Sequence, residues 1–138
     1  MLIDDTFLDA LACEAQASPR LRMNRDLRNS PEDGSQRMLN ALEKGTKVPV
    51  HRHRGTSETQ LLLRGKIDVM FFEGSGRETA RLRLCRDEGR YGVDIPAGVW
   101  HSLEVIEPAV IFESKDGRYS PPSEEDVLAL TFPEASTV

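Results

Sequence analysis

Apolar residues near the N-terminus recur at helical spacing. Ile3, Phe7, Leu8 and Leu11 fall on one face when successive residues are placed about 100° apart. The pattern predicts an amphipathic helix within residues 1–18, with its apolar face packed on a core or on a partner subunit.

From residue 20 to residue 118 the pattern changes to short apolar or alternating runs. Runs such as KIDVMFFE, TARLRLC, VWHSLEV and AVIFESK are separated by Gly, Pro and Asp residues. Short strands with turn residues at roughly ten-residue spacing are typical of an antiparallel sandwich or barrel. We expect turns at Gly65 and at residues 106–108.

The last residues, 119–138, read as a tail. Pro121 and Pro122 exclude a central strand, and Ser123 can cap a short C-terminal helix with Asp126 in its first turn. The chain has no internal repeat and no low-complexity linker, so we expect a single domain over residues 1–138.

Composition narrows the possible partners. The 138 residues carry a net charge of -5, and the Lys and Arg residues are scattered, which argues against nucleic-acid binding. No apolar run reaches the length of a membrane helix, and the N-terminus has acids where a signal peptide has lysines. We therefore expect a cytoplasmic protein, with Cys13 and Cys85 both reduced and buried.

All three histidines of the chain can converge on one site. His51 and His53 share a face if they lie in a strand, and a turn at residues 54–57 can return Glu58 to the same interior. His101 lies on a face with Leu103 and Val105. The alternative is that His51 and His53 form an exposed polar pair and that His101 only makes a hydrogen bond inside the core.

Three imidazoles and one carboxylate suit a divalent transition metal, either Fe, Mn, Ni, Co, Cu or Zn. Such a set leaves positions open for water or substrate. The predicted metal ligands are therefore His51, His53, Glu58 and His101.

The spacing of these residues resembles the two sequence motifs of the cupin superfamily. The first motif is matched by Gly45, His51-x-His53, Glu58 and Gly65, and the second by Gly89, Pro96-x-Gly98 and His101. The second motif departs in two ways, because Gly89 to Pro96 is one residue longer than usual and Val105 stands where Asn is common. The resemblance implies an all-β fold, the cupin double-stranded β-helix or jelly-roll barrel.

Further stretches make the chain similar to the WbuC family of small cupin-fold metalloproteins. They are the N-terminal helix, Arg22-Met23-Asn24, SQRMLNALEKGT and FESKDGRYSP. This resemblance implies a link to bacterial polysaccharide metabolism, and it implies no particular reaction.

Other polar residues are candidates for the same pocket. Gln60 follows Glu58 by two and shares its face. Glu113 and Lys115 share a face too, and they either enter the barrel as catalytic acid and base or form a solvated surface pair. Tyr119 is a third catalytic candidate, and Arg22 is a second candidate for substrate binding.

Three functions remain open at this point. The first is a metal-dependent isomerase, epimerase or lyase acting on a small molecule, with a sugar or sugar derivative as substrate. The second is a metal-dependent dioxygenase, and the third is a non-catalytic small-molecule binding or sensory module, with a purely structural metal also open. Edge strands of small barrels are often covered by a second subunit, so we expect a homodimer.

Overall fold

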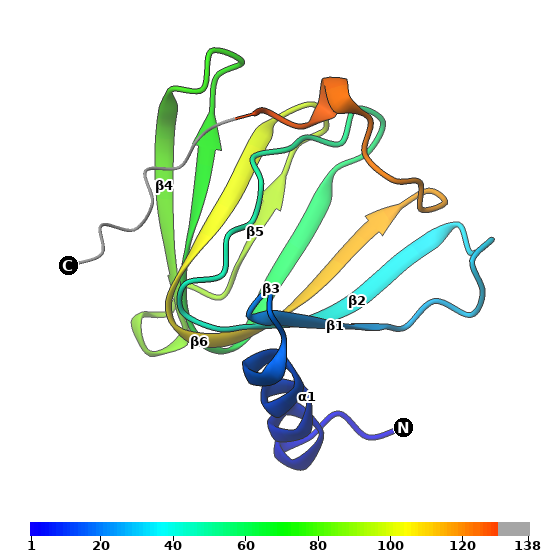
Figure 1. The fold of residues 1–138 in the computed structure, drawn as a ribbon, viewed down its shortest axis with the longest axis vertical. Coiled ribbons are helices and arrows are strands. Elements are labelled where there is room, and N and C mark those ends of the chain that lie inside the picture. The colour runs from blue at the N-terminus through cyan, green and yellow to red at the C-terminus, as the bar shows by residue number, and fades with distance from the viewer. Residues whose placement is uncertain (130–138) are drawn as a thin grey trace.

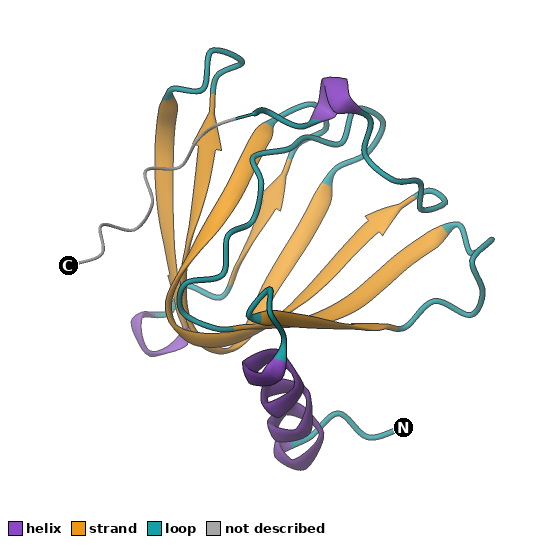
Figure 2. Ribbon diagram, viewed as in Figure 1, coloured by secondary structure: helices purple, strands orange, loops and turns teal. Residues whose placement is uncertain are grey.

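The computed structural model describes residues 1–129. Its elements, in chain order, are α1 (Asp5–Ala17), β1 (Arg22–Asp26), β2 (Ser35–Leu42), β3 (Glu58–Phe72), β4 (Glu78–Cys85), η1 (Arg86–Glu88), β5 (Gly92–Ile95), β6 (Trp100–Asp116) and η2 (Glu124–Asp126). Strands dominate the fold (Figure 2). The predicted all-β class with an N-terminal helix is therefore confirmed.

The strands form a curved antiparallel sheet (Figure 1). Their order is β1-β2-β6-β3-β4, and β5 also pairs with β3. The two longest strands hold it together, because β6 pairs with β2 over its second half and with β3 over nearly its whole length. None of the helices in the described part is long and apolar enough to cross a membrane.

The turns expected at Gly65 and at residues 106–108 are wrong, because β3 and β6 continue through both places. The two strands bend there together, with register shifts between Leu62 and Ile67. Gly65 has a φ of +84°, and a Cβ at this position would lie 2.1 Å from the carbonyl oxygen of Pro108. Glycine is thus needed for a bend within a strand, where its sequence context resembled a turn.

Strand alternation divides the apolar residues between two layers. In β6, Leu103, Val105 and Ile111 face the barrel interior, whereas Val110 and Phe112 face outward. The outward layer is covered by α1, whose buried residues are Leu8, Leu11 and Ala15. Figure 1 shows α1 outside the curved sheet. The interior is filled by the inward side chains of the strands.

The helix begins at Asp5 because the Asp4 side chain accepts a hydrogen bond from the Phe7 amide at 3.0 Å. Ile3 precedes the helix and is exposed. Cys85 is buried as predicted, but Cys13 is exposed on the outer face of α1, so its predicted burial is wrong. Both cysteines are free.

The C-terminal helix expected after Ser123 is shorter than predicted. It is the single 3₁₀ turn η2, and Ser123 Oγ donates to Asp126 Oδ2 at 3.1 Å instead of capping a backbone amide. The rest of the predicted tail, residues 130–138, lies outside the described residues.

Candidate metal centre

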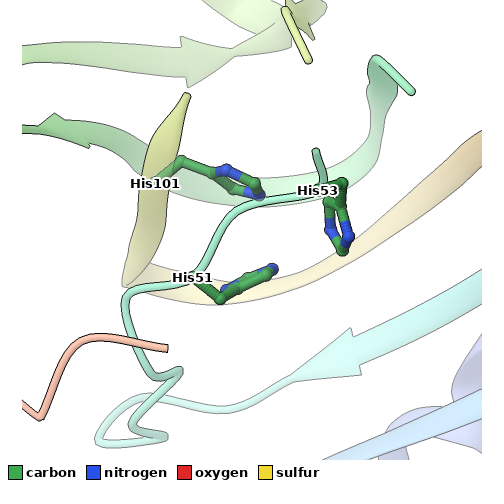
Figure 3. A group of neighbouring side chains, drawn as sticks. All are labelled: His51, His53 and His101. Atoms are coloured by element: carbon green, nitrogen blue, oxygen red, sulfur yellow. The ribbon is translucent and has the colours of Figure 1, made fainter. Parts of the chain in front are cut away.

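The three histidines come from two segments that are distant in the sequence. His51 and His53 lie in the irregular segment before β3, and His101 lies near the start of β6. The backbones of His51 and His101 exchange two hydrogen bonds, of 3.0 and 2.9 Å, which fix the segment against β6. As a result the three imidazoles point toward one another (Figure 3).

The imidazoles are close enough to share one ion. Each offers a nitrogen, and the three nitrogens lie within 4.8 Å of one another. The ring centroids of His51 and His101 are 4.4 Å apart, and that of His53 is 5.0 and 5.5 Å from them. The three rings thus converge on one point without stacking on each other.

Backbone carbonyls determine which nitrogen is free. His51 Nδ1 lies 2.8 Å from the carbonyl oxygen of Pro49, and His101 Nδ1 lies 2.9 Å from that of Val99. A carbonyl only accepts, so each Nδ1 carries the proton, and in the neutral ring Nε2 carries the lone pair. His101 Nε2 is buried and has no hydrogen-bond partner among the described residues. A buried lone pair without a partner is costly, and a metal would satisfy it.

The protonation of these rings also favours metal binding. Burial lowers the pKa of His51, and the neighbouring His101 lowers it further. Burial, followed by the charge of Lys115, lowers the pKa of His53 to about 4. Both rings are therefore neutral at pH 7, which is the form that binds a metal.

Glu58 lies beside two of the histidines at the first position of β3. Its side chain is almost fully buried, with Oε1 at 3.6 Å from His53 Nε2 and Oε2 at 3.4 Å from His101 Nε2. Burial opposes ionisation of this carboxyl, but neighbouring groups, including the Lys115 ammonium 3.1 Å from Oε1, outweigh it and lower its pKa. Glu58 is thus a buried carboxylate next to the imidazole cluster.

Two residues hold the Glu58 carboxylate in place. Gln60 Nε2 donates to Oε2 at 2.9 Å, and Lys115 Nζ lies 3.1 Å from Oε1. Gln60 is itself buried and shares the inward face of β3 with Glu58. The structure thus places Gln60 behind the carboxylate, as an orienting group.

Glu113 and Lys115 both lie on the inward face of β6, the face shared by Ile111. Lys115 Nζ reaches 3.5 Å from His53 Nε2 as well as contacting Glu58. Burial, followed by nearness to Glu58, raises the pKa of Glu113 to about 7. A carboxyl of this kind can both accept and donate a proton near neutral pH.

A cavity of about 430 Å³ opens beside the cluster. Its lining includes His53, Lys115, Tyr119 and Gln36. Tyr119 is half exposed, with the Arg28 guanidinium 5.4 Å from its ring centroid. Arg22 is not part of this lining, and its Nη1 donates instead to the Lys47 carbonyl at 2.7 Å.

The segment of residues 123–128, here called the C-terminal strap, closes one side of the cavity. Its backbone brackets the histidine segment, because Arg52 N donates to the Asp126 carbonyl and Leu128 N donates to that of Val50. The Asp126 carboxylate also pairs with Arg52 at 3.0 Å and Arg54 at 2.6 Å. Sequence reasoning missed both this strap and Gln36, since neither follows a motif.

The residues fit a divalent transition metal. Three imidazoles and a carboxylate are the nitrogen and oxygen donors that such ions prefer, whereas Ca²⁺ or Mg²⁺, which prefer oxygen ligands only, would find too few oxygens.

Residues 3–84 match a family model described as a domain of unknown function (DUF6016). No curated protein matches the sequence.

Solved structures share the fold at low sequence identity. They include the capsular polysaccharide assembling protein CapF of Staphylococcus aureus (22% identity, TM-score 0.63, 80% of this chain and 32% of that one). The Schizosaccharomyces pombe Cnp3 cupin domain has 16% identity and a TM-score of 0.57, over 70% of this chain and 64% of that one. An oxalate oxidase in complex with the substrate analogue glycolate has 14% identity and a TM-score of 0.60, over 77% of this chain and 56% of that one.

The chain thus spans about a third of the length of CapF and less than two thirds of the other two. These likenesses confirm the predicted cupin fold. The finer resemblance to the WbuC family stays a prediction.

Proposed function

The chain belongs to the DUF6016 family, and from the geometry of its own site we propose that it is a metal-dependent enzyme that moves a proton on a small polar molecule. The observation that carries the proposal is the buried, unpartnered Nε2 of His101, which faces two further imidazoles and the Glu58 carboxylate. The ligands would be His51, His53, His101 and Glu58. A metal held there would polarise a carbonyl or hydroxyl group of the substrate.

The proton would be handled by the residues on the inward face of β6. Glu113, a carboxyl on the inward face of β6 near Glu58 and Lys115, would accept a proton from a carbon next to a carbonyl group and return it to the same molecule. Return to the neighbouring carbon, the former carbonyl carbon, while the hydroxyl proton passes to the former carbonyl oxygen, gives isomerisation. Delivery of a proton to the opposite face of the original carbon gives epimerisation. Lys115 and Tyr119 would orient the substrate from the cavity wall.

A sugar derivative is the proposed substrate class. The polar lining of the cavity supports it, and so does the fold likeness to a capsular polysaccharide assembling protein. The resemblance to the WbuC family points the same way, toward bacterial polysaccharide metabolism.

The test is hydrogen exchange in heavy water. Metal-loaded protein is incubated with a panel of sugars and sugar derivatives, and loss of the proton next to the carbonyl group is followed by NMR. We expect exchange with at least one substrate, lost in Glu113→Gln while the metal content is unchanged. Glu88→Gln, on the exposed turn η1, is the matched control and should keep the exchange. Bound metal with no exchange on any compound would contradict proton transfer.

A second candidate is oxygen chemistry, suggested by the fold likeness to an oxalate oxidase. Oxygen uptake by iron- or manganese-loaded protein, in the presence of a small organic acid, would favour it over proton transfer. If a ligand binds while neither exchange nor oxygen uptake occurs, the protein is a binding module.

A further inference from the structure

Gln36 has an unused acceptor inside the cavity wall. Its side chain is only 9% exposed, and Nε2 donates to the Gly117 carbonyl at 3.0 Å. Since a carbonyl only accepts, this bond fixes the amide nitrogen toward Gly117 and turns Oε1 the other way. Oε1 is buried and has no hydrogen-bond partner among the described residues. Such an atom calls for a donor, for which a ligand hydroxyl is suitable.

Lys115 lies directly opposite Gln36, because the two residues are partners in the pairing of β2 with β6. Both line the cavity. Side chains of directly opposed residues lie roughly 5 Å apart at Cβ, so one small molecule can reach both. Lys115 is also the cation next to the imidazole cluster, 3.5 Å from His53 Nε2.

The charges around Lys115 favour an anionic ligand in this part of the cavity. Glu58 is the carboxylate that Lys115 contacts, and in the proposed metal site it would also bind the metal. A dication and an ammonium beside the buried carboxyls of Glu58 and Glu113 leave an excess of positive charge even when both carboxyls are ionised, and this excess is costly without a further anion.

The arginines of the cavity lining are already paired with carboxylates, which favours a carboxylate over a phosphate as the ligand. Arg52 and Arg54 are paired with Asp126, and Arg118 is paired with Glu32. Their guanidinium groups, which match a phosphate best, are therefore engaged. Lys115 offers a single ammonium, which suits a single carboxylate.

We propose that the cavity binds a hydroxylated carboxylate of the sugar-acid class, with Gln36 Oε1 accepting a hydrogen bond from a ligand hydroxyl and Lys115 pairing with the carboxylate. The inference rests on the proposed metal-dependent function and narrows its substrate class. It also makes Gln36 a residue that determines specificity.

The test is calorimetric titration of zinc-loaded protein with four probes that separate the two groups. Gluconate has hydroxyls and a carboxylate, hexanoate lacks the hydroxyls, glucose lacks the carboxylate, and glucose 6-phosphate carries a phosphate instead. We expect gluconate to bind at least about tenfold more tightly than each of the others, since each lost or mismatched polar contact costs about that factor.

Variants assign the preference to the two residues. Gln36→Met should weaken gluconate binding by about tenfold and leave hexanoate binding unchanged. Lys115→Met should remove the preference for gluconate over glucose. Gln16→Met, on the exposed face of α1, is the matched control and should bind all probes as the native protein does.

Equal binding of gluconate and hexanoate, or tighter binding of glucose 6-phosphate, would overturn the inference. These titrations use the native protein, so they test the inference even if Gln36→Met fails to fold. Zinc content is measured separately. If zinc binds but gluconate binds no more tightly than the other probes, the proposed sugar-acid ligand is refuted and the proposed metal site is retained. If no divalent metal binds, the proposed function falls and the inference falls with it.

Discussion

Replacement of Lys115 by methionine tests whether the lysine and a metal serve the same carboxylate. Lys115 Nζ lies 3.1 Å from Glu58 Oε1, and the exposed fractions of the two side chains are 14% and 3%. Methionine keeps most of the volume and removes the charge. Glu58 then loses its cationic partner unless a metal replaces it.

The size of the effect follows from the burial of the pair. Removing one partner of a buried ion pair costs about 3–5 kcal/mol. Glu58 can instead take up a proton, which at pH 7 costs about 4 kcal/mol for a carboxyl of ordinary pKa. Because Lys115 keeps some contact with solvent, we expect the metal-free variant to lose about 3 kcal/mol of unfolding free energy.

In the metal-loaded protein the loss should nearly vanish, because the metal neutralises Glu58. The thermodynamic cycle then requires the variant to bind metal more tightly by the same free energy, about a hundredfold in affinity. Urea unfolding with and without a chelator measures the first quantity, and competition with a chromogenic chelator measures the second.

Lys66→Met is the matched control. Lys66 pairs with Glu107 at 3.5 Å, and Glu107 is largely exposed, so its loss should cost less than about 1 kcal/mol with or without metal. The reasoning is refuted if Lys115→Met loses as much stability with metal as without it, or if its metal affinity stays native. Either result would mean that Lys115 and the metal do not share Glu58.

Three further predictions concern other parts of the molecule. His101→Ala should lower metal affinity by more than about a hundredfold, as measured by chelator competition, while circular dichroism of the metal-free protein stays native. Gly65→Ala should lower the unfolding free energy by more than about 2 kcal/mol in urea, because its Cβ would overlap the Pro108 carbonyl at positive φ; native stability would contradict this. Hydrogen bonds from Arg54 and Arg52 lower the pKa of Asp126 to about 2, so its stabilisation is present above its ordinary pKa and lost as pH falls toward 2. The stability difference between the native protein and Asp126→Asn should therefore shrink between about pH 4 and pH 2, and a constant difference would refute it.

Much of the fold could be predicted because its patterns are local. The apolar spacing of residues 3–11 predicted α1, and the run of short strands predicted the barrel. The errors fall where one local signal has two physical outcomes. Gly65 and Pro108 resemble turn residues, yet they allow two paired strands to bend together, and only the partner strand decides between these outcomes.

The candidate site also has one part that could be predicted from local patterns and one part that could not. Alternation along β6 placed Glu113 and Lys115 on one face but left open whether that face was inward. Helix α1 decides it, because α1 covers the opposite face through Val110 and leaves the charged pair to the interior. The sequence of β6 alone carries no information on where α1 packs.

Gln36 and the C-terminal strap could not be predicted, because their roles depend on pairings between distant segments. Gln36 faces the cavity because β2 lies beside β6 in a register that opposes it to Lys115. Asp126 contacts Arg52 and Arg54 because the chain returns over the histidine segment after β6. A motif fixes spacing within one segment, so it can find the residues that converge on a metal. The residues that choose the ligand come from the neighbouring strands, and the arrangement of those strands must be known before the residues can be recognised.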